Sequence, residues 1–269
     1  MLSKSSRWLT YLTAILYAIL GFFLFFFPER LAPVFAWTVT AFMTMTIGGW
    51  CLGNAWLAWI AARRWKWGLV YPPLIYLWLF GISELIVLYA FRDKLVLVHP
   101  IAWLYLITLI INGITPLIGL IDWIRIRPSG ETGGLQTKAK HLYSVIFYIL
   151  FVGFLGVYGS TVQIGAPGTN GGIFPEIMSL FTLRSFGAFY LSLALAAIPF
   201  LWERNRNTFL THSIASYGLV VFITLAAFVY LPLFDFLAKP GGLAYFGAYL
   251  AVGILLFFEF RNYGTGAAA

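Results

Sequence analysis

One carboxylate lies inside a long apolar stretch of this sequence. Residues 81–93 read GISELIVLYAFRD, and Glu84 comes well before the apolar run ends at Arg92. A carboxylate in hydrocarbon is costly by several kcal/mol unless it is neutral, paired or hydrated. Glu84 is therefore the residue whose type and position most strongly indicate chemistry, such as an ion pair, a hydrogen-bonded network or proton exchange.

Other polar residues are predicted to lie at a depth similar to that of Glu84. With a helix rise of about 1.5 Å per residue, Glu84 lies roughly 24 Å from the inner end of its predicted helix. Thr46, Thr108 and Arg184 come out in the same layer by this calculation. We expect Arg184 to be the ionic partner of Glu84. Two alternatives stay open: a protonated Glu84 bonded to a backbone carbonyl, and an Arg184 that extends to the outer headgroups.

A second polar layer is predicted closer to the inner side. Asn54, Tyr76 and Asn112 fall roughly 12–15 Å from that side by the same rise. Hydrogen bonds between membrane helices stabilise a bundle by about 0.6 kcal/mol each, so a structural role is favoured over a solute site. Because these residues concentrate in the first half of the chain, any binding cavity is expected there or at the seam between the halves.

The composition indicates a membrane protein. The 269 residues are 61% hydrophobic and 10% charged, whereas soluble domains are about half apolar and about a quarter charged. The net charge of +8 comes from Lys and Arg in short connections between apolar runs. This pattern is typical of the positive-inside rule and argues against a nucleic-acid partner. The single cysteine, Cys51, excludes an intrachain disulfide.

Eight apolar runs approach or exceed the length of about 20 residues that a spanning helix needs. Twelve Lys and Arg residues fall on the side that carries both termini and five on the other side, which predicts cytoplasmic termini and insertion in the plasma (inner) membrane. The first run is interpreted as a retained helix and not as a signal peptide. The predicted spans are 9–27, 37–62, 69–91, 101–122, 143–160, 183–202, 213–233 and 242–260.

The chain is interpreted as a tandem repeat. Residues 42–64 align with residues 180–203 at an offset near 139, and four apolar runs precede and four follow a polar linker. An even number of helices per unit makes the two units parallel in the membrane. We therefore predict an all-α polytopic membrane protein with a first four-helix repeat (1–127), a cytoplasmic linker (128–141) and a second four-helix repeat (142–269).

Small residues in the aligned segments are predicted to mediate helix packing. Small side chains four positions apart let two helix backbones approach closely in lipid. The predicted packing residues are Gly48, Gly49, Gly53, Gly187, Ala188 and Ser192.

Motifs for catalysis, nucleotides and metals are missing from the sequence. It contains neither GxxxxGK[ST] nor HExxH, and its three histidines are not predicted to face one another at one depth. We therefore predict no catalytic residue, no cofactor and no metal. An intramembrane enzyme of unrecognised type stays open as a further alternative to the two functions described next.

Two functions fit these features best. The favoured one is a structural or accessory subunit, or a scaffold, of a membrane complex. It would contact membrane lipids or hydrophobic cofactors and other membrane-protein subunits. The alternative is a secondary carrier or lipid-handling protein that uses Glu84, since intramembrane carboxylates serve as proton relays in transporters.

Overall fold

The computed structural model describes residues 1–128, 136–137, 141–163, 173–238 and 240–264. Within these residues the named elements are helices, eight of them long. The long helices are α1 (Lys4–Phe26), α3 (Ala41–Arg63), α4 (Trp67–Ala90), α5 (Pro100–Ile126), α6 (His141–Thr161), α7 (Leu180–Ala197), α8 (Arg206–Val229) and α9 (Gly241–Gly264), while α2 (Pro28–Leu31) is a single turn.

Seven of the long helices are long and apolar enough to cross a membrane, so the chain is a helical, multi-pass integral membrane protein. The remaining one, α3, has the length of a span but falls below the other seven in apolarity. Eighteen of its 23 residues are buried inside the protein. Its surroundings are therefore mainly other helices, which tolerate Thr, Asn and Gly better than lipid does.

Polar side chains mark where several helices begin. Ser3, Thr40 and Ser179 each precede a helix and accept a hydrogen bond from the backbone N–H three residues later. Asn205 accepts from the N–H groups of residues 207 and 208 at the start of α8. These N-caps satisfy backbone donors that the first turn of a helix leaves without partners.

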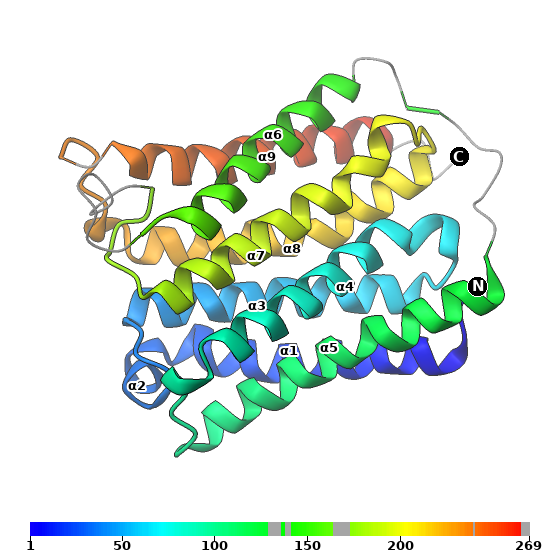
Figure 1. Cartoon of the computed structure of the whole chain (residues 1–269). Coiled ribbons are helices and arrows are strands. Elements are labelled where there is room, and N and C mark those ends of the chain that lie inside the picture. The colour runs from blue at the N-terminus through cyan, green and yellow to red at the C-terminus, as the bar shows by residue number, and fades with distance from the viewer. Residues whose placement is uncertain (129–135, 138–140, 164–172, 239, 265–269) are drawn as a thin grey trace.

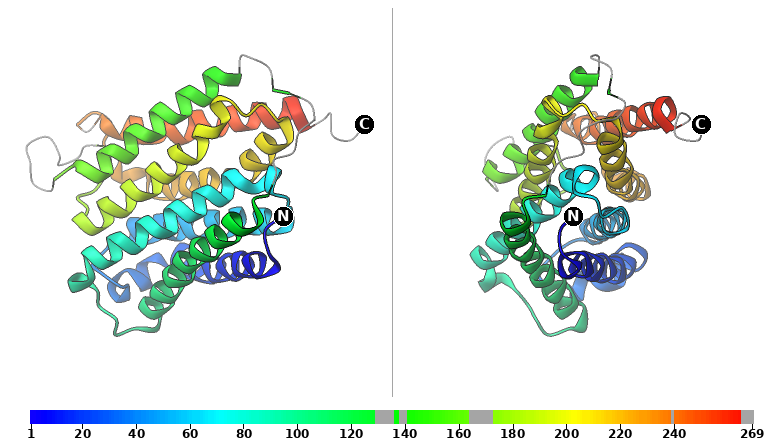
Figure 2. Two further views of the ribbon diagram at one scale, coloured as in Figure 1. Left: turned by 45° about the vertical axis from the view of Figure 1, so that its right-hand side comes forward. Right: turned by 90° about the vertical axis from the view of Figure 1, so that its right-hand side faces the viewer.

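The long helices lie side by side and cross the molecule from one end to the other. α1 begins and α9 ends at the same end of the bundle (Figure 1). Viewed along the bundle, α1 and α5 lie at one extreme and α6 and α9 at the other (Figure 2). The two halves meet along a seam where α3 packs on α8 and α4 packs on α7.

Three of the predicted packing glycines lie where helix backbones approach most closely. A Cβ atom on Gly48 would come within 2.5 Å of the Phe25 backbone nitrogen in α1, and one on Gly53 within 2.6 Å of Leu219 Cα in α8. A Cβ atom on Gly187 would lie 2.7 Å from the backbone nitrogen of Ser160 in α6. Side chains larger than hydrogen would push these helices apart.

The first half is closed by polar bonds between α1 and α5. The Ser3 and Ser6 hydroxyls both donate to the Asp122 carboxylate, and Ser3 N–H donates to it at 3.2 Å. Deeper in the bundle, the Thr13 and Thr115 hydroxyls lie 3.1 Å apart. These contacts hold the N-terminal helix against α5 along much of its length.

The second half is packed differently. α6 and α9 occupy the places next to α7 and α8 but make few contacts with each other. Only 28% and 29% of the residues in their most apolar stretches are buried, against 78% for residues 180–201. α6 and α9 are therefore peripheral helices with a space between them.

Candidate functional sites

Glu84 lies at the seam between the two halves. It is 2% exposed, and the Ser185 hydroxyl of α7 donates to its Oε2 atom at 3.1 Å. Its Oε1 atom is buried and has no hydrogen-bond partner among the described residues. The carboxyl group thus joins a helix of the first half to a helix of the second.

The predicted ion pair between Glu84 and Arg184 is wrong. Arg184 Nη1 donates to the backbone carbonyls of Gly159 and Val162, each at 2.9 Å. In the described residues no ion pair joins Arg184 to Glu84. Arg184 and Ser185 are consecutive on α7, and consecutive helix positions point about 100° apart, so only one of them can face α4.

The remaining residues of the predicted outer layer bond to their own helices. Thr46 donates to the Phe42 carbonyl at 2.9 Å, and Thr108 donates to the Leu104 carbonyl at 2.7 Å. Both hydroxyls are fully buried. They therefore do not extend the contact between Glu84 and Ser185 into a continuous network.

Two residues of the predicted inner layer meet. The Tyr76 hydroxyl of α4 donates to Asn54 Oδ1 of α3 at 2.6 Å. The side-chain amide atoms of Asn112 are buried without a partner among the described residues, and the Asn112 backbone carbonyl lies against Gly81. The predicted inner layer thus consists of the hydrogen-bonded pair Tyr76 and Asn54, with the Asn112 amide separate from it.

The other predicted packing residues, Gly49, Ala188 and Ser192, are also buried. A Cβ atom on Gly49 would lie 3.1 Å from the Phe222 carbonyl oxygen of α8. Ala188 and Ser192 are buried in α7, where the Ser192 hydroxyl donates to the Ala188 carbonyl at 2.7 Å. These contacts leave Ser192 without a polar role across the seam.

A small cavity borders Glu84. We call it the seam cavity, because α1, α3, α4, α5 and α7 all contribute to its wall. Trp37 covers part of it: its indole N–H donates to Thr182 at 3.0 Å, and its ring stacks on Phe181 with 4.2 Å between centroids. The wall includes Tyr17, Trp50, Asn54, Glu84, Tyr105 and Ser185.

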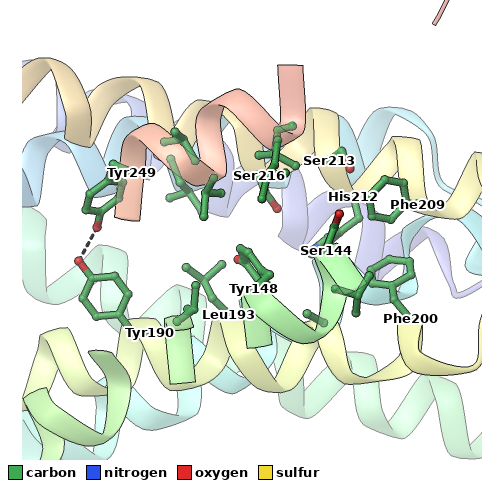
Figure 3. Close-up of a pocket in the computed structure, with 18 of the residues that line it drawn as sticks. Ser144, Tyr148, Tyr190, Leu193, Phe200, Phe209, His212, Ser213, Ser216 and Tyr249 are labelled. Atoms are coloured by element: carbon green, nitrogen blue, oxygen red, sulfur yellow. Dashed lines mark hydrogen bonds between the residues drawn. The ribbon is translucent and has the colours of Figure 1, made fainter. Parts of the chain in front are cut away.

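A larger cavity lies within the second half, between α6, α7, α8 and α9. It contains about 910 Å³ of unoccupied space, part of it open to the surroundings. Its wall is almost entirely apolar, with Leu193 near the middle and Phe200 and Phe209 at one end (Figure 3). We call it the second-half cavity.

The polar groups of the second-half cavity gather toward one end. His212 Nδ1 and the hydroxyls of Ser213 and Ser216 are buried, line the cavity and have no partner among the described residues. Ser144 of α6 lines the same cavity (Figure 3). The opposite end is bounded by a hydrogen bond between the hydroxyls of Tyr190 and Tyr249.

Sequence reasoning missed the second-half cavity, having expected a cavity only in the first half or at the seam. The signal available was the spacing of His212, Ser213 and Ser216, which places short polar side chains on neighbouring positions of one helix face. A hydroxyl in a membrane helix is usually bonded within its own helix, so the spacing alone does not reveal a cavity.

The described residues contain no group of three or more His, Cys, Asp or Glu side chains that could hold a metal ion. Comparison with protein-family models, curated proteins and solved structures gives no match to this chain. The sites must therefore be interpreted from their own chemistry.

Proposed function

We propose that this protein binds one apolar chain of a membrane amphiphile in the second-half cavity, as a lipid-handling protein. The observation that carries the proposal is an apolar space with unpartnered polar groups toward one end. Ligand sites typically combine an apolar wall with a few polar groups. The second-half cavity has this combination.

The position of the polar groups favours an amphiphile over a uniformly apolar molecule. His212 comes six residues after the start of α8, which is roughly 9 Å along the helix axis. A headgroup held by His212, Ser213 and Ser216 would therefore lie near the membrane surface. The apolar chain would extend toward Tyr190 and Tyr249, deeper in the bundle.

The buried, unpartnered polar groups give a physical reason why a ligand would occupy the second-half cavity. A buried polar group without a hydrogen-bond partner costs about 1–3 kcal/mol. A headgroup that accepts from Ser213 and Ser216, or donates to His212, would remove several such costs together. Access is from the side, because α6 and α9 make few contacts with each other.

Purification followed by solvent extraction and mass spectrometry tests this proposal. The full chain should carry a stoichiometric amphiphile, and Ser216→Trp should lower its retention about tenfold or more, the factor that 1.4 kcal/mol represents. Leu225→Trp is the matched control, because Leu225 lies on the same helix but is 47% exposed. Equal retention by both variants would contradict the proposal.

An accessory subunit is the second candidate function. The described residues lie mainly in eight long helices, which favours a protein that acts within the membrane through its helix surfaces. Native sizing after mild detergent extraction tests this candidate. A stable assembly with stoichiometric membrane partners would support it, and an isolated chain that carries an amphiphile would support the first proposal alone.

The tandem repeat with eight spans and cytoplasmic termini is also a proposal. Thr40 and Ser179 cap α3 and α7 in the same way and are 139 positions apart. Gly48 and Gly187 are also 139 positions apart, and each contacts the first long helix of its own half. Equivalent roles at a constant offset support duplication, and α3 then counts as the eighth span.

Two further close contacts recur in both halves, at an offset that is four residues shorter in the first long helix of each half. A Cβ atom on Gly21 would lie 2.7 Å from the Leu52 nitrogen, and one on Gly156 would lie 2.7 Å from the Leu191 nitrogen. Leu52 and Leu191 are again 139 positions apart, and Gly21 and Gly156 are 135 apart.

Reporter tags at the two termini test the eight-span topology. Both tags should face the cytoplasm, and tags on opposite sides of the membrane would overturn it.

A further inference from the structure

We propose that the seam cavity binds one water molecule, and that this water and the Glu84 carboxyl form a buried proton-binding site between the two halves. Four buried polar atoms of the cavity wall have no hydrogen-bond partner among the described residues. They come from four different side chains on α1, α3 and α4: Tyr17 Oη, Trp50 Nε1, Asn54 Nδ2 and Glu84 Oε1.

The hydrogen-bonding capacity of these four atoms matches that of water. The Trp50 indole and the Asn54 amide can only donate from these nitrogens, while the Glu84 carboxylate oxygen accepts and the Tyr17 hydroxyl can do either. A water molecule accepts two hydrogen bonds and donates two. It can therefore accept from Trp50 and Asn54 and donate to Glu84 and Tyr17.

The size of the seam cavity agrees with this occupant. Its room for water-sized occupants suffices for about one water molecule. Buried waters typically make about three hydrogen bonds to polar groups that would otherwise lack partners.

A metal cation fits the wall less well than water does. Glu84 is the one acidic side chain in the wall, and two of the four unpartnered atoms are N–H donors, which repel a cation. Organic solutes are excluded by size. Water is therefore the ligand whose chemistry the described wall satisfies.

No cationic side chain faces the Glu84 carboxylate among the described residues of the cavity wall, so a proton is the charge that can neutralise it. The titratable side chains that face the cavity are Tyr17 of α1, Cys51 of α3 and Tyr105 of α5, and none of them is cationic. From α7 the contact is the neutral Ser185, because Arg184 is bonded to backbone carbonyls elsewhere. When the carboxyl takes up a proton on Oε1, that atom becomes a donor, and the water can accept from it by releasing its bond from Trp50 or Asn54.

Infrared difference spectroscopy of the full chain in lipid vesicles tests this site. We expect a carboxyl C=O band that appears on acidification and disappears on alkalinisation within the folded range, together with a water O–H band that shifts in H₂¹⁸O. Both bands should be lost in Glu84→Gln. The proposal would be overturned if the wild-type spectra lacked the carboxyl band or the water band. It would also be overturned if the Glu84→Gln spectrum superimposed on that of the wild type.

A second pair of variants keeps the test decisive if Glu84→Gln does not fold. Trp50→Phe removes one donor to the water and should shift the C=O band. Trp78→Phe is the matched control, because Trp78 Nε1 is also buried without a partner but lies outside the seam cavity. Equal shifts in both variants would overturn the site, and so would a band that responds to Na⁺ or K⁺ at constant pH, since that result would identify a cation.

Discussion

The two halves of the chain have very different interiors. In the first half, α1 and α5 are joined by the bonds of Ser3 and Ser6 to Asp122 and by the contact between Thr13 and Thr115. In the second half, α6 and α9 make few contacts, and the space between them is the second-half cavity. The difference teaches that a group of four helices encloses a space or closes it depending on whether its two outer helices touch.

The largest effect is expected from a matched pair of leucines. Leu20 and Leu155 lie 135 positions apart in α1 and α6, and both are buried, but Leu155 lines the second-half cavity. Leu→Ala in a packed core costs about 2–5 kcal/mol, and the cost rises with the cavity that is created. Leu20→Ala should fall in the upper part of that range and Leu155→Ala near about 2 kcal/mol. Unfolding in mixed micelles measures both, and equal losses would remove the proposed contrast between the halves.

The next largest effect is expected at a close helix crossing. Gly48→Ala places a Cβ atom 2.5 Å from the Phe25 nitrogen, and because a backbone atom cannot move aside alone, the overpacking should cost about 3 kcal/mol. Gly247→Ala is the control, since its Cβ atom would have no neighbour within 4 Å. That variant should be neutral or more stable by up to about 1 kcal/mol. Thermal unfolding followed by size-exclusion chromatography measures both variants.

An intermediate effect is expected at the polar closure of the first half. Asp122→Ala removes the acceptor of three hydrogen bonds from Ser3 and Ser6. Because hydrogen bonds to charged groups contribute about 1.5–3 kcal/mol and this site is partly exposed, a loss of about 1.5 kcal/mol is expected. Asp93→Ala is the control: its ion pair with Lys94 is about two-thirds exposed on both sides, so a change within about 0.5 kcal/mol is expected. Chemical unfolding distinguishes the two, and similar losses would argue against the closure.

The smallest effect is expected from the hydroxyl contact deeper in the same interface. The Thr115 proton is used in its bond to the Ile111 carbonyl, so Thr13 donates to Thr115. Thr13→Val should therefore cost about 0.6 kcal/mol, the average for such bonds in membrane helices. Thr161→Val serves as the control, since that exposed hydroxyl bonds only within α6 among the described residues. Unfolding curves recorded side by side should resolve the difference, and a neutral Thr13→Val would show that this hydroxyl contact does not stabilise the interface between α1 and α5.

The helices could be predicted from the sequence because lipid imposes a simple rule on composition. Seven of the eight predicted spans correspond to helices that are long and apolar enough to cross a membrane. The prediction is weakest at α3, the helix surrounded by protein, because burial among other helices relaxes the requirement for apolar side chains. Helix ends differ by a few residues, as at α1, which begins at Lys4 because Ser3 caps it.

The partners of Glu84 could not be predicted in the same way. Counting residues along a helix gives the depth of each side chain in the membrane. By depth alone, Arg184 and Ser185 are nearly equal candidates for the partner of Glu84. Which of them faces Glu84 depends on the rotation of α7 about its axis, and that rotation follows from packing at positions such as Gly187. The expected ion pair was therefore wrong, and Ser185, which the predicted layer did not include, bonds to Glu84 instead.

Sequence alone determined that lipid surrounds this chain, approximately where its helices lie, and that one carboxylate sits within an apolar run. These properties depend on local composition and on the fixed rise of a helix. Only the tertiary structure decided that Ser185 bonds to Glu84 and that the second half encloses a cavity. Both depend on how far helices rotate and separate, which is set by many side-chain contacts acting together and by no single segment.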